Sequence, residues 1–234
     1  MAKTKINLPS ILTEDTHFYE EYKDQLQPYL GRQYISYSTA SSYADYLEDF
    51  IKGKIVGIRQ PGSIYTDAGV LVGTALETGV WPQEVPADIK TELELEPLRV
   101  EGAEYERLIV IDRGEYIIVG FIDQFISDPD GVSVYDFKTG SASKKKQYLS
   151  EDYTQVILYA YAEELKGNTI KNTGVQFILR SGSHLNPPLV ITNGVEYLPL
   201  EYNKERVKYA LDKIDKAVEG ISKLYTTYQK IFSK

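Results

Sequence analysis

The chain has 234 residues, of which 42% are hydrophobic and 26% are charged. This composition is typical of a folded globular protein and disfavours a disordered chain, a collagen-like repeat or a coiled-coil array. No run approaches 18 consecutive apolar residues, and the first twenty residues lack the apolar stretch of a signal peptide, so we expect a cytoplasmic protein without a membrane span. The absence of cysteine excludes disulfides, thiol nucleophiles and iron–sulfur clusters held by cysteine.

Charge is distributed unevenly along the chain. The net charge is −8, but residues 1–137 contain 11 basic and 24 acidic residues, whereas residues 138–234 contain 15 basic and 10 acidic residues. The densest basic run is Lys144-Lys145-Lys146. Such a run is either a solvated loop or a surface that binds an anion, and the run alone does not decide between them.

The first third of the sequence has a helical pattern. Apolar residues recur at three- and four-residue intervals over 18–30, over 43–51 and over 65–80, which predicts three amphipathic helices. Ser38 or Ser41 is the expected N-cap of the second helix, and Pro82 is expected to end the third. The segment 84–106 holds eight acidic and two basic residues, and we expect it to cover the surface.

The pattern changes to β-structure after residue 107. Three apolar runs, over 108–111, 116–126 and 132–137, are separated by turn residues and predict an antiparallel meander. A helix over 152–165, a strand over 175–179, a pair of strands around Val190 and Tyr197, and a long final helix capped by Asn203 complete the prediction. Arg180, directly after the strand over 175–179, is either a phosphate contact or an ordinary strand-end arginine.

Two carboxylates interrupt these strands at positions where apolar residues are expected. Asp136 and Lys138 project from the same face of one strand because side chains alternate, and a neighbouring antiparallel strand can place Asp123 beside them. A buried carboxylate must be paired or must bind a metal. The pattern therefore indicates either a Mg²⁺ site or a buried Asp–Lys ion pair without a metal.

The wider context resembles a known family. The segments Gly120-Phe121-Ile122-Asp123, Asp136-Phe137-Lys138-Thr139-Gly140 and Gln155-Val156-Ile157-Leu158-Tyr159 resemble the RecB-like branch of the PD-(D/E)XK nuclease superfamily. The resemblance implies an α/β restriction-endonuclease-like core of order αβββαβ, with a mixed central sheet flanked by helices and with extra helices at both ends. We expect one nuclease domain over 1–234, with an N-terminal helical part (1–63), a catalytic core (64–181), and a hairpin with a C-terminal helix (182–234).

The resemblance also implies roles for individual residues. Asp123 and Asp136 would bind Mg²⁺, with Mn²⁺ as a substitute and the Phe137 carbonyl as a further ligand, and Lys138 would assist the attacking water. Relatives carry a metal-binding histidine on an upstream helix, and Glu77 occupies that position here; it is either a third ligand or an exposed helix residue. The expected substrate-binding residues are Gln155, Tyr159, Lys144, Lys145 and Lys146.

The implied activity is a Mg²⁺-dependent deoxyribonuclease, with an exonuclease of the phage or plasmid recombination type preferred. DNA is the implied substrate, and a recombinase, a single-strand annealing protein or a helicase is an implied partner, in the cytoplasm of a bacterial host if the chain is phage-encoded. An endonuclease or resolvase with the same site, and a DNA- or partner-binding module that does not cleave, are the alternatives. Relatives with an iron–sulfur cluster use four cysteines for it, so this chain differs from them.

Overall fold

The computed structural model describes residues 6–58 and 62–232. The chain forms two compact units, one made of residues 1–60, 108–120 and 208–234 and the other of residues 61–107 and 121–207. Strand β4 (Ile117–Asp128) and helix α7 (Lys204–Phe232) contribute residues to both units. The expectation of one domain with parts 1–63, 64–181 and 182–234 stays a prediction.

The first unit begins with short helical segments. These are α1 (Lys23–Leu26), η1 (Gln27–Tyr29), α2 (Tyr37–Asp45), α3 (Leu47–Phe50) and the π-helical turn η2 (Ile51–Ile55), and strand β1 (Tyr34–Ile35) pairs in parallel with β4. A continuous helix over 18–30 was the wrong prediction, because the buried Phe18 and Tyr19 lie in turns that place apolar side chains at helix-like intervals. The N-cap of α2 is Ser36 rather than Ser38 or Ser41, since its hydroxyl accepts the Thr39 N–H at 3.2 Å.

Helix α4 (Ile64–Thr78) opens the second unit at the N-cap Ser63. It ends at Gly79, in the left-handed conformation (φ 83°), and not at Pro82. This positive φ favours glycine, and a Cβ atom at Gly79 would in addition displace the Arg99 guanidinium, whose Nη1 would lie 1.5 Å away.

The acidic segment 84–106 does more than cover the surface, contrary to the prediction. It contains β2 (Ile89–Thr91) and η3 (Glu96–Leu98), and its apolar residues Ile89, Leu93 and Leu98 are buried in one cluster with helix α4. The acidic side chains between them hid this apolar spacing in the sequence.

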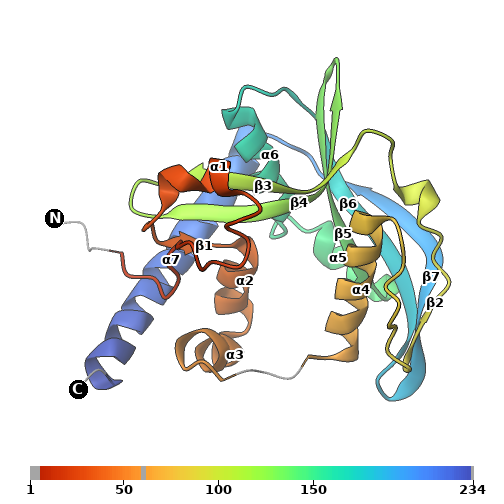
Figure 1. Ribbon diagram of the computed structural model, residues 1–234, viewed down its shortest axis with the longest axis horizontal. Helices are drawn as coiled ribbons and strands as arrows, with labels where there is room; N and C mark the ends of the chain where they lie inside the picture. The colour runs from red at the N-terminus through yellow and green to blue at the C-terminus, as the bar shows by residue number, and fades with distance from the viewer. Residues whose placement is uncertain (1–5, 59–61, 233–234) are drawn as a thin grey trace. The chain divides into compact units, whose positions relative to one another are not determined.

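The seven-stranded sheet is mixed, with strand order β1-β4-β5-β6-β7-β2, and β3 pairs with β4. Its remaining strands are β3 (Glu104–Asp112), β5 (Gly131–Gly140), β6 (Ile170–Ser183) and β7 (Asn186–Pro199). Pairing is antiparallel for β4–β5 and β6–β7 and parallel for β5–β6, the two strands that run side by side in Figure 1. The predicted α/β core with a mixed sheet flanked by helices is confirmed. The separate strands expected around Val190 and Tyr197 are instead one strand, β7, with a register shift.

Helices α4 and α6 (Gln155–Leu165) both contact β5. Phe137 packs against the apolar cluster of α4, whereas the neighbouring Asp136 bonds to Tyr153, directly before α6. Alternation along β5 therefore sends the apolar side chain to one layer and the carboxylate to the other.

The chain ends in α7, whose N-cap is Asn203 as predicted: its side-chain oxygen accepts the Arg206 N–H at 2.9 Å. No helix within residues 6–58 and 62–232 combines the length and the apolar character needed to cross a bilayer.

Glu163 anchors the end of α6 and provides a test of the fold. Its side chain is fully buried and accepts hydrogen bonds from Arg107, Lys166 and Asn168. Burial raises its pKa, but the hydrogen bonds from Lys166 and Arg107 outweigh burial and lower it below the ordinary value. The resulting stabilisation is present at neutral pH and is lost as the pH falls through the folded pKa.

We therefore expect Glu163→Gln to lower the free energy of unfolding by about 2 kcal/mol at pH 7, because Arg107 and Lys166 lose their buried partner. Urea unfolding at pH 7 and in acid measures this, and the difference from the unsubstituted protein should shrink in acid. The control Glu151→Gln changes an exposed side chain and should have an effect within about 0.5 kcal/mol. Equal stability of Glu163→Gln and the unsubstituted protein at pH 7 would contradict this assignment.

Candidate active site

The candidate site forms where strands β4 and β5 separate. Their last registered pair at this end is Gln124 with Tyr135, so the next positions would place Asp123 opposite Asp136. Here Asp123 Oδ2 accepts the Phe137 N–H at 2.6 Å, in place of a backbone carbonyl. The end of the ladder thus brings two carboxylates from distant parts of the sequence together.

Asp136 is the most enclosed group of the site. It is 0% exposed, and its Oδ2 lies 2.6 Å from Lys138 Nζ and accepts the Tyr153 hydroxyl at 2.8 Å. Its other oxygen, Oδ1, is buried without a hydrogen-bond partner in the described part of the chain. A buried carboxylate oxygen without a donor is costly unless a cation or a water approaches it.

Asp123 and Asp136 together carry more negative charge than the nearby Lys138 can neutralise. Burial raises the pKa of Asp123 well above its ordinary value, and the charge of Asp136 raises it further, against the opposing effects of Lys138 and the Phe137 N–H. Burial alone would lower the pKa of Lys138, but the carboxylates of Asp136 and Asp123 outweigh it and raise the pKa. Lys138 is therefore a charged ammonium group at neutral pH.

A cavity of about 340 Å³ opens beside these residues. It is lined by α4 and by strands β3 to β5, and its lining includes Glu77, Glu106, Asp123, Phe137 and Lys138. Glu77 therefore faces the same cavity as Asp123, as the sequence led us to expect of a third ligand, although its role stays a prediction.

Glu106 also lines the cavity, and sequence reasoning missed it. We had assigned it to the acidic surface segment, whereas it lies on β3, the strand that pairs with β4. Among the described non-glycine residues, Glu106 alone has a positive φ, at 50°. Because Glu106 lies just before the apolar run 108–111, the sequence could have indicated that it belongs to the same strand.

The donor set fits a hard divalent cation. Glu77, Glu106, Asp123 and Asp136 supply carboxylate oxygens around one ammonium group, and Mg²⁺ prefers oxygen ligands. Asp136 Oδ1 has no hydrogen-bond donor in the described part of the chain, so it is an oxygen that a cation could bind. Glu77, Glu106 and Asp123 line the cavity, whereas the fully buried Asp136 is not part of its lining. Within residues 6–58 and 62–232, no three histidine or acidic side chains form a compact ligand group.

Tyr153 links the buried aspartate to helix α6, and it was not predicted. Its hydroxyl lies 2.8 Å from Asp136 Oδ2 and 3.3 Å from Gln155 Oε1, and Gln155 Nε2 donates to the Tyr159 hydroxyl at 3.0 Å. Burial raises the pKa of Tyr159, and Asp136 and Asp123 raise it further, so its hydroxyl stays protonated. Substrate contact by Gln155 and Tyr159 stays a prediction; in this structure both belong to the network that holds Tyr153 against Asp136.

The predicted basic run follows β5 directly, in η4 (Ala142–Lys144) and α5 (Lys145–Tyr148). Lys144 and Lys146 are exposed, but Lys145 forms an ion pair with Glu196 at 2.8 Å, so part of the run is neutralised. Gly140 sets the start of this turn, because a Cβ atom there would lie 2.8 Å from the ring of Phe177. DNA contact by Lys144, Lys145 and Lys146 stays a prediction.

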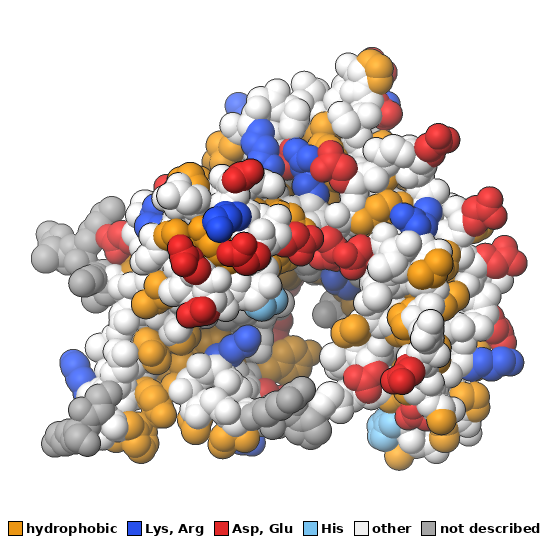
Figure 2. Space-filling model, viewed as in Figure 1, with side chains coloured by type: hydrophobic (Ala, Val, Ile, Leu, Met, Phe, Trp, Pro, Cys, Tyr) orange, Lys and Arg blue, Asp and Glu red, His pale blue; other side chains and the backbone are white. Residues whose placement is uncertain are grey.

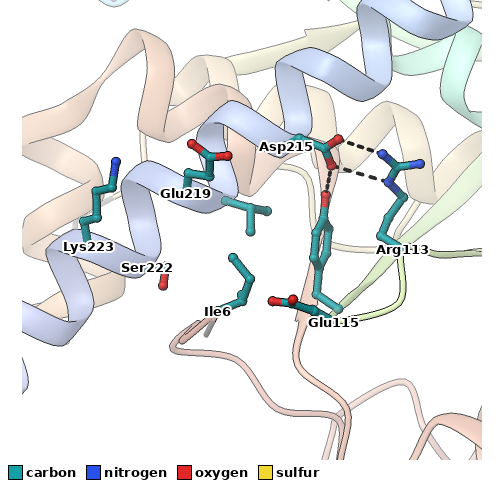
Figure 3. A pocket seen from close by; sticks show the side chains of 9 residues that line it. Ile6, Arg113, Glu115, Asp215, Glu219, Ser222 and Lys223 are labelled. Carbon is teal, nitrogen blue, oxygen red and sulfur yellow. Dashed lines mark hydrogen bonds and ion pairs between the residues drawn. The ribbon is translucent and has the colours of Figure 1, made fainter. Parts of the chain in front are cut away.

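A second cavity, of about 400 Å³, lies in the first unit and contains none of the predicted site residues. Asp215 lies at its wall and faces Arg113 (Figure 3). It pairs with Arg113 at 2.6 Å and accepts a hydrogen bond from the Tyr116 hydroxyl. Burial and then Asp215 raise the pKa of Tyr116. Because Asp215 is already paired, and because the predicted site residues lie elsewhere, this cavity is not the candidate active site.

The family comparison agrees with the geometry. The profile of the PD-(D/E)XK nuclease superfamily matches residues 68–230, which include every residue of the candidate site. The chain belongs to the PD-(D/E)XK nuclease superfamily.

Similarity to individual proteins is distant. The structure of SSO0001 matches with 16% sequence identity and a TM-score of 0.40, over 85% of this chain and 84% of that one. A protein from Eubacterium rectale described as a "Putative exonuclease" matches with 10% identity and a TM-score of 0.49, over 91% of this chain and 88% of that one. No curated protein matches the sequence.

The raised pKa of Asp123 predicts that this residue destabilises the protein when no metal is bound. A carboxyl group whose pKa is raised by folding lowers stability as the pH rises above its ordinary value. Asp123→Asn should therefore raise the melting temperature in EDTA at pH 7.5, by about 2 to 4 °C for each kcal/mol regained. The gain should vanish near pH 4, where the native carboxyl group is protonated too.

Differential scanning calorimetry in EDTA measures this effect. Asp88→Asn is the matched control, because it removes the same charge from an exposed side chain of the same unit and should leave the melting temperature unchanged. A melting temperature of Asp123→Asn below that of the unsubstituted protein at pH 7.5 would contradict the excess negative charge.

Proposed function

We propose that the chain is a Mg²⁺-dependent deoxyribonuclease that hydrolyses phosphodiester bonds at the cavity lined by α4 and by β4 and β5, where these two strands separate. The observation that carries this proposal is the position of Asp123, Asp136 and Lys138 where the two strands separate, with a buried carboxylate oxygen that lacks a donor. Superfamily membership supports the reaction class.

Asp123 and Asp136, together with Glu77 and the Phe137 carbonyl, would hold the metal, with Glu106 as an additional carboxylate at the same cavity. Bound there, Mg²⁺ or Mn²⁺ would lower the pKa of a coordinated water and stabilise charge on the scissile phosphate. Lys138 would orient the attacking water and stabilise negative charge as it develops. Tyr153 keeps the Asp136 carboxylate fixed in orientation through its hydrogen bond.

Long-range electrostatic attraction does not favour DNA binding, because the protein has a net charge of −8 and DNA is also negative. Figure 2 shows acidic side chains at many points of the face that it draws. DNA would instead be held by local basic groups beside the cavity, among which Lys144 and Lys146 are exposed and directly follow β5.

The proposal is tested by incubating end-labelled linear duplex, single-stranded DNA and covalently closed circles with the protein and Mg²⁺ or Mn²⁺. We expect hydrolysis that EDTA abolishes and that Asp136→Asn and Lys138→Met each slow by about a hundredfold or more. Asp88→Asn should retain the full rate. Cleavage that survives both site substitutions would contradict the assignment.

The same substrates distinguish the candidate activities. An exonuclease, which we prefer by analogy with small phage and plasmid recombination enzymes, degrades linear DNA and leaves the closed circle intact. A cut circle would indicate an endonuclease or resolvase, and binding without cleavage under any divalent metal would indicate a module recruited by a recombinase, an annealing protein or a helicase.

A further inference from the structure

Arg180 is a half-buried arginine near the end of β6 that has no acidic partner among residues 6–58 and 62–232. Its guanidinium carbon lies 4.2 Å from the centre of the Tyr65 ring, and its buried Nε has no hydrogen-bond partner in the described part of the chain. Arg32, Arg107 and Arg113 each pair with a carboxylate. Among the described arginines, Arg99, Arg180 and Arg206 have no ion pair, and Arg206 donates instead to two backbone carbonyls. In a chain with 34 acidic and 26 basic residues, this leaves a positioned positive charge uncompensated.

Tyr65 fixes the orientation of this guanidinium. The ring lies in the first turn of α4 and packs against the apolar cluster beneath the helix. Its hydroxyl lies 3.2 Å from His184 Nδ1 and accepts the His184 N–H at 3.4 Å. An aromatic face attracts a guanidinium without neutralising its charge, so Arg180 stays available for an anionic ligand.

The Arg180–Tyr65 pair lies just beyond the candidate active site. Tyr65, Gly69, Gly73 and Glu77 follow each other at four-residue intervals on α4, and the last three line the cavity. Tyr65 is one turn, about 6 Å, from Gly69 along the helix axis. A Cβ atom added to Gly73 would meet nothing within 4 Å, so the space beside this turn of the helix is open.

The sheet places Arg180 at the same end. Thr139, which lines the cavity, pairs with Ile178, and Arg180 follows two residues later, about 7 Å along β6. The Tyr148 side chain lies within electrostatic reach of both Lys138 and Arg180. Along both elements, Arg180 and Tyr65 lie about two nucleotide spacings beyond residues that line the cavity.

We propose that Arg180, stacked on Tyr65, binds a non-scissile phosphate of the DNA strand whose neighbouring phosphodiester is cut in the cavity. This inference rests on the proposed nuclease function and names a subsite for its substrate. A guanidinium presents planar paired N–H donors that match two phosphate oxygens, and partial burial strengthens such charge-assisted bonds.

The test is a scan of oligonucleotides in which one phosphate at a time is replaced by an uncharged methylphosphonate. Binding is measured by fluorescence anisotropy in EDTA, apart from any hydrolysis. For the unsubstituted protein, we expect that a methylphosphonate at one particular position weakens DNA binding about tenfold. In Arg180→Met, overall binding should be about tenfold weaker, that position should lose its effect, and the salt dependence should fall by about one counterion.

Matched variants separate this subsite from charge and folding effects. Lys171→Met removes one positive charge near the other end of the same strand and should change affinity less than twofold. Tyr65→Phe keeps the stacking ring and should retain affinity, whereas Tyr65→Leu should lose it. Arg180→Lys keeps the charge but lacks the planar paired N–H donors, so it should bind DNA with intermediate affinity. If Arg180→Met does not fold, Arg180→Lys is used for the test instead.

The outcomes distinguish this inference from the proposed function. If the protein cleaves DNA but the methylphosphonate profile is the same in Arg180→Met, the subsite is wrong and the nuclease assignment stands. If binding depends on Arg180 but no divalent metal supports cleavage, the subsite stands and the nuclease assignment fails. If the unsubstituted protein does not bind DNA at all, the proposed Arg180 subsite is wrong.

Discussion

The carboxylate of Asp136 is withdrawn from solvent in the middle of β5, beside a second carboxylate on the neighbouring strand and with one ammonium group against it. Such an arrangement is unfavourable for a protein alone, because two desolvated acids share one positive charge. The raised pKa of Asp123 expresses that imbalance. A hard cation would relieve it, so the proposed metal site and the expected weakness of the metal-free fold have the same physical cause.

The surrounding structure serves to hold this arrangement in place. The β4–β5 ladder ends where the acids meet, and the Asp123 side chain takes the Phe137 N–H that the ladder leaves without a partner. Alternation along β5 sends Phe137 into the apolar layer under α4 and Asp136 toward Tyr153. A rigid scaffold with apolar packing on one face thus fixes polar groups on the other, as catalytic positioning requires.

The sequence predicted the elements that have strong local signals. The meander over residues 104–140, helix α4 and the cap at Asn203 were identified because periodicity and turn residues agree there. The Asp-x-Lys spacing located Asp136 and Lys138 on one face, and Glu77 was found through family resemblance. Local patterns failed where tertiary contacts decide. Phe18 and Tyr19 are buried although they lie in turns. Glu106 lines the cavity from a strand that begins inside an acidic segment of the sequence. Tyr153 contacts Asp136 through its hydroxyl alone, and no sequence spacing indicates this contact.

The most direct measurement is the anomalous diffraction of a crystal soaked in Mn²⁺. We expect a peak in the cavity with oxygens of Asp123 and Asp136, including Asp136 Oδ1, at about 2.0 to 2.2 Å, the spacing typical of a small divalent cation. Mn²⁺ located elsewhere, or Asp136 still bonded only to Lys138 and Tyr153 at saturating Mn²⁺, would contradict the view that these buried acids form a metal site.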